Sequence, residues 1–165
     1  MAGTLRRFCV TLCVPLALAL TGCIAQFQTS QPYTPGEGVN LQVGQVKVRN
    51  LMVIADASGQ GVLSASAVSY ADDTLTAVSG TPHKADGTPG SALVVTSTGL
   101  PLAMPANTLF ILTDSPLRVA VTSPDLKPGL LAEITLTFAK AGDVKALAPV
   151  VSSSEPEYSG ITVGS

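Results

Sequence analysis

The feature of this sequence that most constrains its fold is an alternation of apolar and polar residues with a period of two. It is clearest from Leu131 to Ala139, where polar residues separate four apolar positions. Those four positions are Ala132, Ile134, Leu136 and Phe138. Because successive side chains of a β-strand point to opposite faces of a sheet, this spacing predicts a half-buried strand. After residue 22, no apolar pattern with the period of a helix persists over three turns.

Other segments extend the same prediction along the chain. The run 46–54 has four apolar residues on one phase, and Leu51 and Val53 make its later half apolar on both faces. The residues of that one phase are Val46, Val48, Met52 and Ile54. Further β-rich runs are 62–70, 74–78, 93–96, 108–112, 117–122 and 144–150. Clusters of Gly, Pro and Asp separate these runs, which predicts an all-β fold, an antiparallel β-sandwich, over residues 41–151.

The N-terminus resembles a lipoprotein signal peptide. Arg6 and Arg7 precede an apolar run, Phe8–Leu20, that is shorter than the roughly 20 residues a membrane span needs. The run closes with Leu20-Thr21-Gly22-Cys23, which resembles the bacterial lipobox. In such signals, signal peptidase II recognises the three residues before the cysteine, the thiol carries a diacylglyceryl group, and the new amine can be acylated, for example with palmitate. The alternative is an ordinary secretory signal with a chance cysteine.

This motif predicts how the chain is divided. The predicted segments are a signal peptide at 1–22, the lipidated Cys23 with a flexible tether to residue 40, the β-sandwich domain at 41–151, and a flexible polar tail at 152–165. Cys9 and Cys13 leave with the signal, so no intramolecular disulfide is expected. We expect the mature chain on the extracytoplasmic face of the cell membrane, held by diacylglycerol and N-acyl lipid on Cys23. Its expected partners include the lipoprotein-processing enzymes and the membrane.

Composition excludes several classes of function. The chain has 9 Lys and Arg against 11 Asp and Glu, so it offers no basic surface of the kind that binds nucleic acid. Its single histidine, His83, lies in a Gly- and Pro-rich loop near Asp86, without the nucleophile-elbow motif of a serine hydrolase. Asp72 and Asp73 are predicted to form a turn rather than a catalytic pair of carboxylates. We predict no enzymatic activity and no cofactor besides the lipid.

A series of short motifs supports a more specific comparison. In chain order they are Val48–Ile54, Asp73-Thr74-Leu75, Pro105–Leu112, Leu117–Val121, Leu126-Lys127-Pro128-Gly129, Ile134–Phe138, Ala141–Val144 and Pro149-Val150. In this order they resemble the periplasmic copper chaperone family PCu(A)C, and more closely the small actinobacterial envelope lipoproteins that share its domain. The resemblance covers about residues 43–151. It implies a cupredoxin-like or immunoglobulin-like sandwich.

The resemblance does not extend to the copper ligands of that family. PCu(A)C chaperones hold Cu(I) with two histidines and two or more methionines, soft donors that suit a soft cation. The strand that would carry their His-x-Met pair reads Leu117–Val121 here, and the upstream ligand segment reads Ala92–Val95, so neither holds a donor. Met52 lies on an apolar strand, where it is expected to pack in the core. The weak alternative metal set is Met52, His83 and Met104.

Three functions remain compatible with these features. We favour a non-catalytic, membrane-anchored extracytoplasmic lipoprotein that acts as a binding or accessory module for an unidentified partner in the cell envelope. A copper-handling, chaperone-like protein is one alternative. A carrier of an apolar ligand is another, suggested by the small residues Ser64–Ala67 and by only three aromatic residues between positions 41 and 151. Lys47 and Arg49 are expected on the solvated face of a strand, where they could also meet anionic lipid head groups near the anchor.

Overall fold

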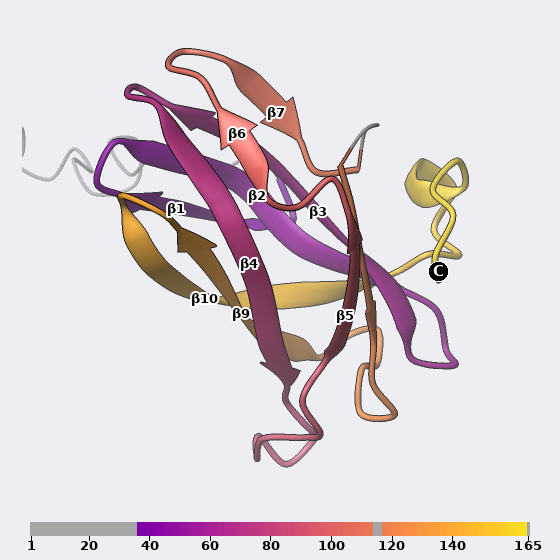
Figure 1. Ribbon diagram of the computed structural model, residues 1–165. Coiled ribbons are helices and arrows are strands. Elements are labelled where there is room, and N and C mark those ends of the chain that lie inside the picture. Colours follow the sequence, from indigo (N-terminus) through magenta and orange to yellow (C-terminus); the bar gives the residue numbers. More distant parts are fainter. Residues whose placement is uncertain (1–35, 114–116, 165) are drawn as a thin grey trace, which may run out of the picture. The chain divides into compact units, whose positions relative to one another are not determined.

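The computed structural model of the chain describes residues 36–113 and 117–164. The predicted signal peptide, with Leu20, Thr21, Gly22 and Cys23, and most of the tether lie outside the described residues. The part that the structure describes contains β-strands and one short 3-10 helix, and no helix in it is long and apolar enough to cross a membrane (Figure 1). The elements are β1 (Val39–Val43), β2 (Val46–Ala55), β3 (Gln60–Ser69), β4 (Asp73–Pro82), β5 (Val94–Thr98), β6 (Leu102–Met104), β7 (Leu109–Ile111), β8 (Arg118–Thr122), β9 (Leu131–Phe138), β10 (Gly142–Ser152) and η2 (Pro156–Tyr158).

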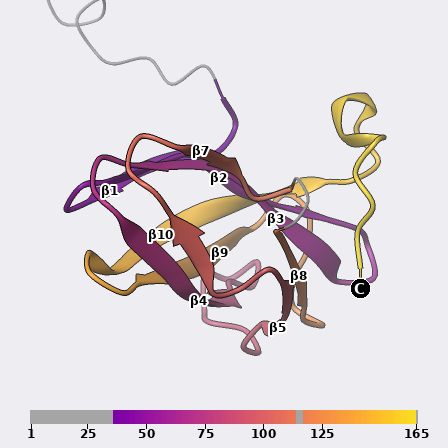
Figure 2. The same cartoon turned by 45° about the horizontal axis from the view of Figure 1, so that its top comes forward.

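The strands form a curled sheet that folds over into two layers. Its order is β5-β8-β3-β2-β10-β9-β4-β6, with β1 paired to β2 and β7 paired to β3 beside this path. β10 joins the layers, because residues 142–149 pair with β9 while Val150–Ser152 pair with β2 in parallel. Figures 1 and 2 show β10 running from beside β9 toward the C-terminal segment. The other pairings between described strands are antiparallel, so the predicted all-β sandwich is confirmed with one parallel junction.

The main hydrophobic core lies between the two layers. β9 supplies the four apolar residues of its predicted inward phase, all of them buried, while Leu131 and Glu133 are exposed. β2, β3 and β8 supply Val, Leu and Ala residues from the opposite layer. The largest completely buried side chains of this core include Leu51, Leu63, Leu75, Leu117, Leu126, Ile134 and Leu136. The half-buried strand predicted from residues 131–139 is therefore confirmed.

A bulge in β2 corrects the predicted phase of that strand. Asn50 has a positive φ of 54°, and the pairing of β2 with β3 shifts register between Arg49 and Met52. An extra residue at such a bulge reverses which side chains point inward. Met52 and Ile54 therefore do not share the main core with Val46 and Val48, which pack there together with Leu51, Val53 and Ala55. They point out of the opposite face of the sheet.

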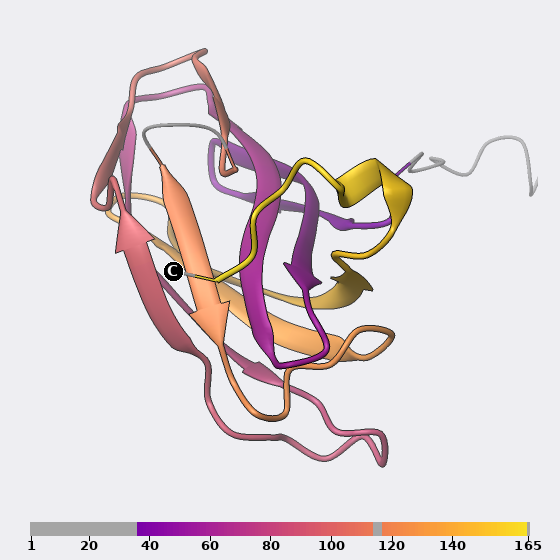
Figure 3. The same cartoon turned by 90° about the vertical axis from the view of Figure 1, so that its right-hand side faces the viewer.

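The C-terminal segment covers that opposite face. Tyr158, Ile161 and Val163 pack against a second apolar cluster, formed by Met52, Ile54 and Val62. The Arg118 guanidinium also holds this segment, donating through Nη2 to the carbonyls of Thr162 and Gly164 at 2.6 and 2.7 Å. Figure 3 shows the segment in yellow, crossing the outer face of β2 and β3. This packing differs from the flexible tail expected for residues 152–165. The outer face of β2 is apolar here, and the C-terminal segment removes it from water.

Two short strands were not anticipated. β1 begins at Val39, inside the segment expected to be a tether, and it pairs with β2 through Leu41↔Val48 and Val43↔Val46. The backbone enters β1 close to the bulge, since a Cβ at Gly38 would lie 2.5 Å from the carbonyl carbon of Asn50. β6 has only three residues and extends the edge of β4. Three residues are too few for a period of two to be recognised in β6, whereas the alternation of residues 39–43 was divided by the boundary expected at residue 40.

Candidate functional site

The two segments that the sequence resemblance aligns with copper-ligand segments, Ala92–Val95 and Leu117–Val121, contribute to the neighbouring strands β5 and β8. β5 and β8 pair in antiparallel register, with Val95 opposite Val121 and Thr96 opposite Ala120. Val119 and Val121 are buried in the main core, while the outward side chains of β5 are Val and Thr. None of these side chains is a soft donor of the kind that Cu(I) prefers. The residues at this position therefore do not fit a copper ion.

The three remaining soft donors lie in different parts of the fold. Met104 is buried in β6 opposite Asp73, at the beginning of β4. His83 follows Pro82, at the other end of β4, which is roughly 30 Å away at about 3.3 Å per strand residue. Met52 belongs to the second apolar cluster, on the outer face of the opposite layer. The structure does not bring Met52, His83 and Met104 together, and within residues 36–113 and 117–164 no three His, Cys, Asp or Glu side chains are grouped to hold a metal.

His83 and Asp86 occupy a tight loop rather than a catalytic arrangement. The Nδ1 atom of His83 lies 3.2 Å from the carbonyl oxygen of Gly87. Asp86 Oδ1 accepts hydrogen bonds from the hydroxyl and the backbone N–H of Thr88, at 2.7 and 3.0 Å. The hydrogen bond from the Thr88 hydroxyl, followed by the one from the Thr88 N–H, holds the pKa of Asp86 below its ordinary value. The carboxylate therefore stabilises its own loop and does not orient the imidazole.

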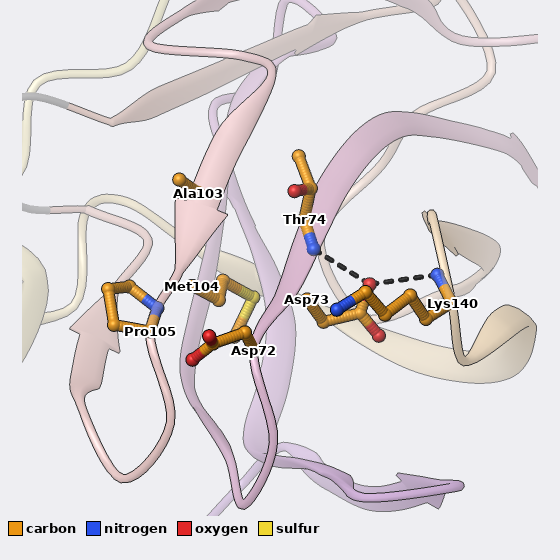
Figure 4. Close-up of a pocket in the computed structure, with 7 residues that line it drawn as sticks. All are labelled: Asp72, Asp73, Thr74, Ala103, Met104, Pro105 and Lys140. Carbon is orange, nitrogen blue, oxygen red and sulfur yellow. Dashed lines mark hydrogen bonds between the residues drawn. The ribbon is translucent and has the colours of Figure 1, made fainter.

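Asp72 and Asp73 line a shallow surface pocket of about 320 Å³ (Figure 4). The remaining lining residues are Thr74, Ala103, Met104, Pro105 and Lys140. Asp72 Oδ1 accepts a hydrogen bond from the backbone N–H of Ala106 at 2.8 Å. It thereby connects the turn before β4 to the loop after β6. The chain bends at residues 70 and 71, Asp73 is the first residue of β4, and each aspartate has a separate partner set.

Asp73 is the more constrained of the two carboxylates. It is buried, and it accepts hydrogen bonds from the backbone N–H groups of Thr74, Lys140 and Ala141 at 2.7, 2.9 and 2.9 Å. Burial alone raises its pKa, but the three N–H donors outweigh burial and hold the pKa below its ordinary value. Through these hydrogen bonds, Asp73 connects the beginning of β4 to the turn between β9 and β10. The sequence had no signal for this role, because an aspartate at the beginning of a turn looks the same whether or not it is buried.

A different surface lies on the outer face of β2 and β3, on the side of the bulge that holds Lys47 and Arg49. We call it the open face and define it as Lys47, Arg49, Val68, Tyr70, Leu109 and Ile111. Pairing places Lys47 opposite Val68 and Val68 opposite Leu109, so these side chains form one row across β2, β3 and β7. Leu109 is 62% exposed, Tyr70 50% and Ile111 41%. The open face therefore combines large exposed apolar side chains with two cations.

The alanines of the small-residue segment in β3 pack closely instead of lining a cavity. Ala65 and Ala67 are buried in the main core, where β7 and Leu112 run alongside them. The two surface pockets near Asp73 lie at the turn before β4 and do not involve these alanines. Small side chains at these positions allow close packing of strands. The geometry therefore favours a packing role for Ala65 and Ala67 over a ligand cavity.

The fold, but not the sequence, matches known proteins. No protein-family model and no curated protein sequence matches the chain. The copper-bound PCuAC domain from PmoF2 has a TM-score of 0.50 and 22% identity, and the alignment covers 69% of this chain and 98% of that domain. The apo PCuAC domain from PmoF1 has a TM-score of 0.49 and 23% identity, covering 69% of this chain and 99% of the other. The first of these likenesses shows a PCuAC-like fold, which confirms the expected cupredoxin-like or immunoglobulin-like architecture.

Proposed function

We propose that this chain is a lipid-anchored, extracytoplasmic and non-catalytic binding module of the cell envelope, built on a PCuAC-like fold. The observation that carries the proposal is the motif Leu20-Thr21-Gly22-Cys23 behind a short apolar run. The described residues support it with a well-packed β-sandwich in which the carboxylates of Asp72, Asp73 and Asp86 and the imidazole of His83 contact backbone groups. The proposed partners are the membrane, the lipoprotein-processing enzymes and an envelope component.

The anchor is tested by replacing the cysteine that would carry it. Cys23→Ala is expected to abolish retention in the membrane fraction and to leave a precursor of uncut size, because neither lipid transfer nor cleavage can then occur. Cys13→Ala, ten positions upstream in the predicted signal, is the matched control and is expected to be processed normally. Cell fractionation and mass spectrometry of the product provide both readouts. Normal cleavage and membrane retention of Cys23→Ala would contradict the proposal.

Copper handling is a second candidate because of the likeness to a copper-bound PCuAC domain. Tight binding of Cu(I) needs several soft donors that converge on one ion, whereas Met52, His83 and Met104 lie apart. We therefore expect no stoichiometric transfer of Cu(I) from a chromogenic chelator to the full chain. Transfer to the wild type that is lost in His83→Ala would favour copper handling over the binding module.

A further inference from the structure

The open face has the composition of a surface that meets a charged lipid bilayer. Lys47 Nζ lies 3.1 Å from the Tyr70 hydroxyl and 4.8 Å from the centre of its ring. A cation and an amphipathic aromatic side chain are therefore in direct contact. Leu109 and Ile111 add exposed apolar surface to the same face. Exposed apolar side chains gathered around charges mark interaction surfaces rather than ordinary solvated ones.

The charge of the open face has one sign. The strands β1, β2, β3 and β7 contain Lys47 and Arg49 but no Asp or Glu. Arg49 is exposed and uses Nη1 to bond the carbonyls of Leu41 and Val48, each at 3.0 Å, which leaves other guanidinium donors for a phosphate. The carboxylates at the borders are engaged, Asp72 with the Ala106 N–H and Glu37 with the Tyr158 hydroxyl. The face is therefore complementary to an anionic surface.

The attachment of the chain points to the same occupant. Residues 23–36 connect the predicted anchor to the first described residue, and fully extended they reach at most about 50 Å. The chain then joins β1 beside the open face, where the Gly38 N–H donates to Asn50 Oδ1 at 2.8 Å, next to Arg49. A short tether that ends here keeps these cations within reach of the bilayer that holds the lipid. A symmetric contact with a second copy is less favourable, because it would bring equal charges together.

We propose that the open face lies against the surface of the anionic bilayer in which Cys23 is anchored. This inference rests on the proposed lipid anchor and adds an orientation to it. Lys47 and Arg49 attract lipid phosphates, while Leu109, Ile111 and the Tyr70 ring enter the interfacial region. The layer formed by β4 and β9 then faces away from the membrane.

The proposal can be tested with a single fluorescent probe, because the chain contains no tryptophan. Leu109→Trp places the probe on the open face, and Leu131→Trp, at an exposed leucine of β9, is the matched control. The full chain, purified with its lipid, is reconstituted into vesicles of phosphatidylglycerol and brominated phosphatidylcholine. We expect strong quenching at position 109 and little at position 131. Lys47→Glu combined with Arg49→Glu is expected to remove most of the quenching, as is replacement of phosphatidylglycerol by phosphatidylcholine.

The possible outcomes separate the orientation from the anchor. A chain that does not float with either kind of vesicle contradicts the anchor, and the orientation with it. A chain that floats but is quenched equally at both positions contradicts the orientation alone. Equal quenching at position 109 with and without phosphatidylglycerol contradicts the role of Lys47 and Arg49. A blue shift at position 109 that depends on protein concentration and not on lipid would assign the face to a second copy instead.

Discussion

The outer face of β2 and β3 has two halves that differ in composition and in cover. On one side of the Asn50 bulge, Met52, Ile54 and Val62 are buried beneath the C-terminal segment. We call this half the covered face. On the other side, the open face presents Lys47, Arg49 and Tyr70 together with the exposed leucine and isoleucine of β7. The same two strands thus carry a buried apolar cluster where the C-terminal segment covers them and a mixed, exposed surface where it does not.

The C-terminal segment therefore covers only one half of the outer face of β2 and β3. The C-terminal segment is fixed by Arg118 and by Tyr158, whose hydroxyl donates to Glu37 Oε2 at 2.6 Å and lies 3.7 Å from Met52 Sδ. Burial of Met52, Ile54 and Val62 stabilises this contact by removing apolar area from water. The open face has no such intramolecular cover among the described residues. The contrast supports a role in stability for the covered face and a role in contact for the open face.

The sharpest comparison uses the same substitution on both halves. Ile54→Ala is expected to lower the free energy of unfolding by about 2–5 kcal/mol, because it opens a cavity at a completely buried position. Ile111→Ala removes the same atoms from a side chain that is 41% exposed and is expected to cost about 1 kcal/mol or less. Urea denaturation of both variants measures the difference. Equal losses would mean that both halves are packed alike.

Substitutions at Asn50, in the bulge that separates the two halves, are expected to have the second largest effect on the free energy of unfolding. Asn50→Ala is expected to cost about 2 kcal/mol, because alanine is strained at a φ of 54° and cannot accept the hydrogen bond from the Gly38 N–H. Asn50→Gly removes the same hydrogen bond without the strain and is expected to cost about 1 kcal/mol. Thermal or urea unfolding distinguishes the two. Identical values for the two variants would show that strain at position 50 is not important.

Tyr158 makes the covered face sensitive to high pH. Burial, followed by the hydrogen bond to Glu37, raises the pKa of Tyr158 from 10.0 to about 12. Between these values the unfolded chain releases the phenolic proton and the folded chain retains it, so this contribution to stability is complete below pH 10 and declines toward pH 12. Tyr158→Phe is expected to cost about 1 kcal/mol at neutral pH and to remove this part of the decline. A variant whose stability falls as steeply as that of the wild type would contradict the assignment.

The smallest expected effect on stability belongs to the cations of the open face. Replacing both by glutamine, Lys47→Gln with Arg49→Gln, is expected to change the free energy of unfolding by about 0.5 kcal/mol or less, because both side chains are at the surface. Urea denaturation of the full chain is the measurement. A loss as large as that of Ile54→Ala would make these cations structural and would weaken their assignment to a partner.

Most of the fold followed from local pattern, and the failures have physical causes. The half-buried strand β9 alternates without interruption, so its buried residues could be read from sequence. β2 could not, because one residue with a positive φ reverses its phase and because both of its faces are buried beyond that point. The cover supplied by residues 153–164 depends on contacts with β2 and β3 that are distant in sequence. A polar, Ser-rich composition does not reveal them.

Prediction of the candidate sites is also limited by contacts between residues that are distant in sequence. Scattered donors were visible in the sequence, and the structure adds only that Met52, His83 and Met104 lie apart. The buried role of Asp73 depends on N–H groups of Lys140 and Ala141, which no local pattern connects to it. Lys47 and Arg49 were recognisable as a pair on one strand face. The apolar residues that complete the open face come from β7, which reaches β3 only through the fold.

Hydrogen exchange on membranes tests the difference between the two halves most directly. The full lipidated chain is placed on vesicles of phosphatidylglycerol and phosphatidylcholine or of phosphatidylcholine alone, and deuterium uptake is followed for peptides from β7, from β1 and from residues 153–164. Our account predicts that anionic vesicles slow exchange in β7 and β1 and leave residues 153–164 unchanged. Protection of residues 153–164 by anionic vesicles, with β7 unaffected, would contradict it.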